Sequence, residues 1–176
     1  MTDVGTCTDT DIIIPETYQG IPVIAIGASA FIDCTSIKSV EIRAKVESIG
    51  ARAFYGCTSL ESIVMPEGLT WIGRYAFEGC TSLKSIVIPE GFDWCGEWIF
   101  YGCTSLESLN IPLSARNLDS QIAAGCTNLK TVNYNGTVEQ WNSIVFYGPL
   151  GDSNTGEYVI YCTDGQIAKD GTVTYK

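Results

Sequence analysis

The chain has 176 residues, of which 45% are hydrophobic and 17% charged, and its formal net charge at pH 7 is −10. This length is sufficient for one domain with a continuous core, and the hydrophobic content excludes a disordered chain. The acidic charge argues against binding to nucleic acid or to an anionic membrane surface, because both need a basic patch. No apolar run is long enough for membrane insertion.

Residues 1–26 contain a shortened copy of a pattern that recurs through the chain. The segment from Cys7 to Pro15 repeats the segment from Cys80 to Pro89 with one residue fewer, and a loop over 16–22 follows it. Terminal repeats are usually atypical because they close the core against water, so we expect an N-terminal cap here. The first residues lack a basic stretch followed by an apolar one, so no signal peptide is visible.

Residues 27–131 contain a short motif of the form Gly-Cys-Thr-Ser-Leu that recurs every 23 residues without slippage. A fixed period in this range predicts a solenoid, in which each repeat is one coil stacked on the preceding coil. The fold class expected is therefore a mainly-β or α/β solenoid with one parallel strand per coil and irregular caps, all within a single domain. The cysteines that mark the period are Cys34, Cys57, Cys80, Cys103 and Cys126.

One coil can be divided into local elements. Ile63, Val64 and Met65 alternate as in a strand with Ile63 and Met65 inward, and Pro66 ends the strand because proline removes a donor. Gly73 is expected to relieve a tight corner. The helical spacing of the Ala-Phe pair and the cysteine that follow predicts a short helical or 3₁₀ segment over 76–80.

Outward positions of the coils also match in register. The residue after the leading Leu or Ile alternates in charge from coil to coil, and the next position holds Ser or Thr. Opposite charges directly across strands are favourable and like charges are not, so the alternation indicates coils stacked without offset. The charged column is Lys38, Glu61, Lys84, Glu107 and Lys130.

The repeating cysteines are interpreted as a ladder of buried thiols that act as small hydrophobic side chains. A residue that recurs once per coil lies parallel to its copies, and parallel Cβ vectors strain a disulfide. A soft-metal site is the less favoured alternative, because the chain has no histidine and no close-spaced ligand pair.

The period stops at Val132, and residues 132–176 are expected to form a C-terminal cap. Thr137 and Gln140 have the spacing of a capping box that opens a short helix. Residues 147–157 form a polar loop, and the segments 158–162 and 172–175 are expected to be closing strands around a turn at 163–165.

The repeated unit Leu-x-x-Ile-x-Ile-Pro-x-x-Leu-x-x-Ile-Gly-x-x-Ala-Phe-x-Gly-Cys-Thr-Ser resembles the BspA-like leucine-rich repeat family of bacterial surface proteins, over about residues 12–131. The resemblance implies a curved right-handed solenoid, a secreted or cell-surface location, and adhesion or protein-binding roles; a cytoplasmic location stays open. The chain departs from the family pattern at Arg43, Asp119 and Ala123. The family offers no catalytic residues to transfer.

No residue pattern indicates an enzyme or a cofactor. The chain has no histidine to activate Cys95 as a nucleophile, and no glycine motif for a nucleotide. The run Asp152-x-Asn154-x-Gly156 resembles half of a calcium loop, but Thr163 stands where the bidentate glutamate is needed, so a polar loop is expected.

The candidate binding residues are aromatic and occupy outward positions of neighbouring coils. Exposed apolar patches mark interaction sites, and Trp and Tyr dominate binding hot spots, so a protein ligand of a monomeric module is the first hypothesis. A glycan stacked on the same rings and a structural spacer are the alternatives, and the rings can also simply cover one another as a ladder. The residues are Tyr55, Trp71, Tyr75, Trp94, Trp98 and Tyr101.

Overall fold

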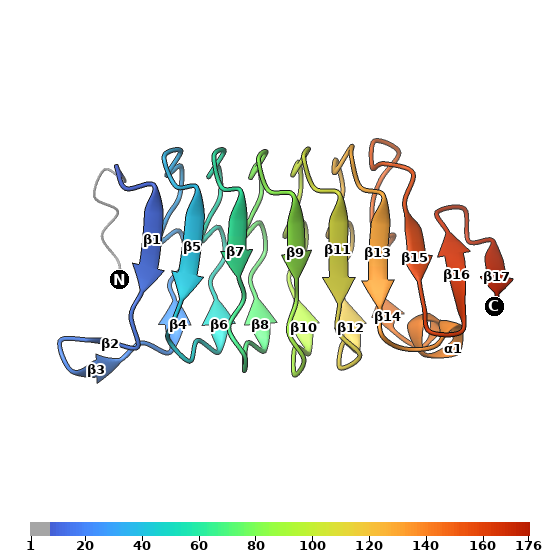
Figure 1. Ribbon diagram of the computed structural model, residues 1–176, viewed down its shortest axis with the longest axis horizontal. Coiled ribbons are helices and arrows are strands. Elements are labelled where there is room, and N and C mark those ends of the chain that lie inside the picture. The colour runs from blue at the N-terminus through green and yellow to red at the C-terminus, as the bar shows by residue number, and fades with distance from the viewer. Residues whose placement is uncertain (1–7) are drawn as a thin grey trace.

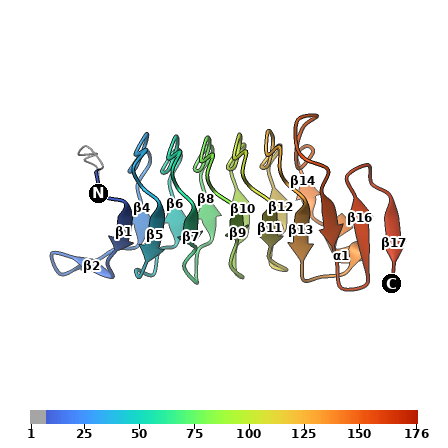
Figure 2. The same cartoon turned by 45° about the horizontal axis from the view of Figure 1, so that its top comes forward.

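The computed structural model describes residues 8–176, which form a solenoid of stacked coils (Figure 1). Each regular coil contributes one strand to a front row and one shorter strand to a back row. The rows run side by side along the long axis, joined by turns (Figure 2). The front strands are β1 (Asp11–Ile14), β5 (Ser39–Ile42), β7 (Ser62–Val64), β9 (Ser85–Val87), β11 (Ser108–Ile111), β13 (Thr131–Tyr134) and β15 (Val159–Tyr161).

The back row was not expected from the sequence. In each coil the back strand comes after the front strand in the sequence, separated from it by a chain turn. The back strands pair in parallel as one six-stranded sheet. They are β4 (Ala25–Ile26), β6 (Ser48–Ile49), β8 (Trp71–Ile72), β10 (Trp94–Cys95), β12 (Asn117–Leu118) and β14 (Val145–Phe146).

Stacking without offset is confirmed by the strand register. Ser39 lies opposite Ser62 in the front row, and Trp71 lies opposite Trp94 in the back row, each pair 23 positions apart in the sequence. Within one coil Ile63 and Met65 are buried, whereas Val64 is 72% exposed. The expected alternation of the front strand is therefore confirmed.

The front ladder is interrupted at one level. Strands β1, β5 and β7 form one sheet and β9 begins another, so β7 and β9 do not pair (Figure 1). At the same level the back strands β8 and β10 do pair. The expected stack of the charged column is therefore incomplete. Lys130 Nζ and Glu107 Oε2 of this column form an ion pair at 2.8 Å.

The predicted helical segment over 76–80 is wrong, because the chain forms a series of turns there. Tyr75 has a φ of 60°, outside the helical region. The backbone N–H groups of Tyr75, Phe77 and Gly79 donate to carbonyls of the next coil, Glu97, Ile99 and Tyr101, at 2.8–3.1 Å. These hydrogen bonds between coils alternate with turn hydrogen bonds within the coil, from Glu78 N to Tyr75 O and from Cys80 N to Phe77 O, both at 3.2 Å.

One column of the core consists of identical aromatic side chains. The rings of Phe31, Phe54, Phe77 and Phe100 stack with centroids 5.1–5.6 Å apart. Such pairs stabilise by about 0.5–1.5 kcal/mol beyond the burial of their area. The ladder ends where Ala123 replaces the next phenylalanine.

Gly73 permits a close approach between coils rather than an unusual φ. A Cβ atom at this position would lie 2.5 Å from the main-chain nitrogen of Ala51, and Gly50 and Gly96 face the same constraint.

Where Arg43 replaces the expected proline, its N–H donates to the Ile14 carbonyl at 3.0 Å, a bond that proline cannot make.

Irregular elements lie at both ends. Residues 16–22, expected as a loop, form the hairpin of β2 (Thr17–Tyr18) and β3 (Ile21–Pro22). The expected capping box opens α1 (Val138–Asn142), with Thr137 and Gln140 bonded reciprocally. The chain ends in β16 (Gly165–Ala168), which was not predicted, and β17 (Val173–Tyr175), both antiparallel.

We predict that Gly73→Ala lowers the free energy of unfolding by about 1–3 kcal/mol, because the new methyl group overlaps main-chain atoms that cannot move aside. Urea denaturation measures the change. The control is Glu67→Ala at an exposed position, which is expected to leave the midpoint unchanged. Equal midpoints for the two variants would contradict backbone contact at this corner.

We also predict that Lys84→Glu lowers the midpoint of thermal unfolding more than Lys84→Gln does. The pKa of the neighbouring Glu107 carboxyl is lowered first by its hydrogen bond to Lys130 and then by the Lys130 and Lys84 charges. In Lys84→Glu this carboxylate would face a second negative charge. High salt should remove most of the difference between the variants. A difference that persists in high salt would point to packing instead.

Candidate binding surface

Two tryptophans of the back row form the first aromatic pair. Trp71 begins β8 and Trp94 begins β10, and parallel pairing places them directly opposite each other. Their rings are stacked, with centroids 6.0 Å apart and planes 5° from parallel, and Trp94 is 40% exposed. Their neighbours in the column, Ser48 and Asn117, are polar.

The second pair lies in the turns that follow the back strands. Tyr75 and Trp98 both have left-handed backbones, and their ring centroids are 5.2 Å apart with a 31° tilt. The Arg52 guanidinium lies over the Tyr75 ring, 5.3 Å from its centroid. Trp98 Nε1 donates to Gln121 Oε1 at 2.9 Å. Four successive coils thus contribute one side chain each to this column, in the order guanidinium, phenol ring, indole ring and amide.

A third column holds the remaining predicted residues. Tyr55 and Tyr101 occupy equivalent positions two coils apart, so Glu78 lies at the same position between them. Tyr101 is 43% exposed. Burial raises the pKa of the Glu78 carboxyl, and the Arg52 charge partly offsets this.

The second and third columns enclose a cleft of about 350 Å³, which we name the aromatic–acid cleft. It brings together three of the six predicted aromatic residues. Trp71, Trp94 and Tyr55 do not line it. The lining residues are Tyr75, Glu78, Trp98, Tyr101, Gln121 and Asp152.

Sequence reasoning missed the contribution of Asp152 to this cleft. The residue follows the end of the repeats, so no period places it beside a coil. Its Oδ1 accepts hydrogen bonds from Gly125 N, Asn154 N and Thr155 Oγ1 at 3.0–3.1 Å. Burial would raise the pKa of Asp152, but these hydrogen bonds hold it below its usual value. The loop that resembles half of a calcium site therefore uses this carboxylate as a hydrogen-bond acceptor.

The repeating cysteines are buried, and their sulfurs make a contact that the sequence did not indicate. The Sγ atoms of Cys57, Cys80, Cys103 and Cys126 each donate to a phenylalanine carbonyl of the preceding coil, 26 residues earlier, at 3.1–3.2 Å. Cys34 begins the column and is also buried. The thiols thus link coils as weak donors in addition to filling space.

Cys95 lies in the core at the position that Ile72 occupies in the preceding coil. Burial raises the pKa of its thiol to about 12, opposed in part by a backbone hydrogen bond from Asp119. A thiol this weakly acidic is a poor nucleophile. Cys7 lies outside the described residues.

Within residues 8–176, no three histidine, cysteine or acidic side chains are grouped closely enough to hold a metal ion. No helix formed by these residues has the length and apolar character needed to cross a membrane.

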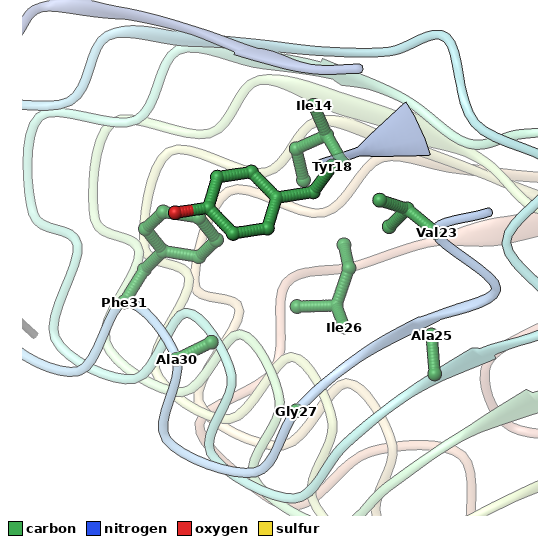
Figure 3. Close-up of a pocket in the computed structure, with 8 residues that line it drawn as sticks. All are labelled: Ile14, Tyr18, Val23, Ala25, Ile26, Gly27, Ala30 and Phe31. Carbon is green, nitrogen blue, oxygen red and sulfur yellow. The ribbon is translucent and has the colours of Figure 1, made fainter. Parts of the chain in front are cut away.

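A separate apolar pocket of about 120 Å³ lies at the N-terminal end of the core, where the phenylalanine ladder begins at Phe31 (Figure 3). Tyr18 extends into it from the β2–β3 hairpin, toward Phe31. The other lining residues are Ile14, Val23, Ala25, Ile26, Gly27 and Ala30. The described residues that line it carry no carboxylate, amine or guanidinium group, and the Tyr18 hydroxyl is the one ionisable group among them.

Comparison with known families identifies a BspA type leucine rich repeat region, in six copies, over residues 24–150. No curated protein matches the chain.

Several solved structures resemble this fold. A leucine rich repeat protein of T. pallidum has a TM-score of 0.70 and 30% identity over 82% of this chain and 72% of that one. A leucine rich cell surface protein of Faecalibacterium prausnitzii has a TM-score of 0.69 and 36% identity over 77% of this chain and 35% of that one. A leucine-rich repeat protein of Bacteroides ovatus has a TM-score of 0.63 and 29% identity, over 86% and 42%. The chain therefore spans less than half of the latter two.

We predict that Cys95 and Cys126 of the folded protein resist alkylation by iodoacetamide at pH 9. A pKa of about 12 for each thiol leaves about one-thousandth of it as thiolate, about 500-fold less than an unshifted thiol. Peptide mass spectrometry of native and urea-unfolded samples measures the rate at each position. Rates in the native protein that equal those in urea would contradict burial of these sulfurs.

Proposed function

Because the chain belongs to the BspA-type leucine-rich repeat family, whose modules generally mediate protein interactions, we propose that it is a non-catalytic module for protein recognition. The observation that carries this proposal is the pair of ring stacks on adjacent coils, Trp71 with Trp94 and Tyr75 with Trp98. We assign ligand binding to these rings and to the neighbouring Tyr55 and Tyr101.

The physical basis is preorganisation. Stacked rings held by strand register lose little conformational freedom when a ligand binds, and this lowers the cost of association. Trp94 and Tyr101 keep 40% and 43% of their surface exposed, so a partner can still bury a large area. Aromatic side chains of this kind contribute much of the binding energy at protein interfaces.

We further propose that the module acts at a bacterial surface, in adhesion. Its support is the repeat family together with the similar protein of Faecalibacterium prausnitzii, which is described as a cell surface protein. A glycan-binding module and a structural spacer are the competing functions.

The double variant Trp94→Ala/Trp98→Ala tests the proposal. We expect wild-type protein to bind members of an array of extracellular proteins, and the variant to lose about 2 kcal/mol or more of that binding energy, as hot-spot truncations do. Biolayer interferometry on the array hits measures the loss, and thermal unfolding checks that the variant is folded.

The matched control is Tyr147→Ala, which removes a ring that is 66% exposed and lies outside the proposed surface. It should bind as the wild type does. Binding only to a glycan array would support the carbohydrate alternative. Unchanged protein binding by the folded double variant would refute the assigned surface, and no binding to either array would favour the spacer.

A further inference from the structure

The aromatic–acid cleft combines two carboxylates with aromatic rings and contains no basic lining residue. Three successive coils and the C-terminal loop supply its walls. Glu78 and Asp152 carry the acidic groups, and the whole chain has a net charge of −10. A cleft lined by one sign of charge concentrates ligands of the opposite sign.

The two carboxylates differ in how far they are already engaged. The hydrogen bonds from Gly125 N, Asn154 N and Thr155 Oγ1 all end on Asp152 Oδ1, which fixes the carboxylate in place. The Glu78 carboxylate accepts no hydrogen bond from a residue in the range 8–176, although the Arg52 charge acts on it, and the three hydrogen bonds to Asp152 Oδ1 leave Oδ2 on the other side of that carboxylate. These oxygens are therefore the acceptors that a ligand N–H group can reach.

The chain itself shows how a cation fits beside these rings. Arg52 lies over one face of Tyr75, and Trp98 comes from the coil on the opposite side. Both faces of Tyr75 are thus covered, which leaves little flat area for a sugar ring to stack on. Tyr101 is 43% exposed and stacks on no other ring among residues 8–176. Its ring remains for a cation–π contact with a ligand.

We propose that the aromatic–acid cleft binds the guanidinium or ammonium group of an arginine or lysine side chain in an exposed basic segment of a protein partner. The inference rests on the proposed function and specifies the chemistry of the partner. The carboxylates of Glu78 and Asp152 accept the N–H groups, and Tyr101 packs against the side chain. Charge-assisted bonds of this kind are about twice as strong as neutral ones.

The test uses an N-acetylated, C-amidated tetra-arginine peptide, titrated by calorimetry at physiological ionic strength. We expect the wild type to bind it, and Glu78→Gln/Asp152→Asn to bind about tenfold or more weakly, because each substitution removes a charged acceptor. Asparagine keeps the acceptor oxygen that holds the C-terminal loop. The same peptide with citrulline, a neutral isostere of arginine, should not bind.

The matched control is Glu61→Gln/Glu67→Gln, which makes the same change in net charge at exposed positions outside the cleft. Equal weakening by the two double variants would show a general effect of net charge and overturn the proposal. So would no binding by the wild type, equal binding of the citrulline peptide, or displacement of the peptide by neutral oligosaccharides.

Failure of this inference is distinguishable from failure of the proposed function. A protein ligand that is lost in Trp94→Ala/Trp98→Ala but retained in Glu78→Gln/Asp152→Asn overturns the cation assignment and leaves protein recognition by the rings intact. A ligand retained by both variants overturns both.

Discussion

Backbone contact between successive coils is the constraint on which the rest of this structure depends. At the corner marked by Gly50, Gly73 and Gly96 there is no room for a Cβ atom between one coil and the next. In the turns, N–H groups such as those of Tyr75 and Phe77 donate across to the next coil. Coils held this closely cannot slide, so each side chain must lie beside its equivalent 23 residues away. Identical small or flat side chains satisfy that condition, and the cysteine and phenylalanine columns consist of them.

The same constraint explains where variation is tolerated. Inward positions of the back row keep apolar residues, as at Ile49, Ile72 and Cys95, and Cys95 changes type without leaving the core. Outward positions lie at the surface rather than in the core, so they can change character from coil to coil. Trp71 and Trp94 are flanked by Ser48 and Asn117 in register. An aromatic surface can therefore occupy two coils in the middle of the solenoid without altering the fold.

Features that follow from the 23-residue period could be predicted from the sequence. These are the stacking of the coils, the alternation of the front strand, and the outward position of the six aromatic residues. It failed where the backbone departs from helix or strand geometry. Ala76 and Phe77 have helical spacing, but the left-handed φ of Tyr75 turns the chain toward the next coil instead. It also missed Asp152, because a residue outside the repeats reaches the cleft only through the tertiary path of the C-terminal loop. Hydrogen bonding by the cysteine sulfurs depends on atomic distances that spacing does not encode.

The missing pairing between β7 and β9 has a mechanical consequence. At that level the back strands β8 and β10 are joined by their ladder, whereas the front strands are not. Coils that are hydrogen-bonded through their back strands and turns, but not through their front strands, separate most easily at the front. The solenoid should therefore bend most readily between these two coils, with β8 and β10 acting as the hinge. Trp71 and Trp94 lie at that hinge. Bending there would change the distance between the front strands β7 and β9 while leaving the spacing of the two indole rings nearly constant.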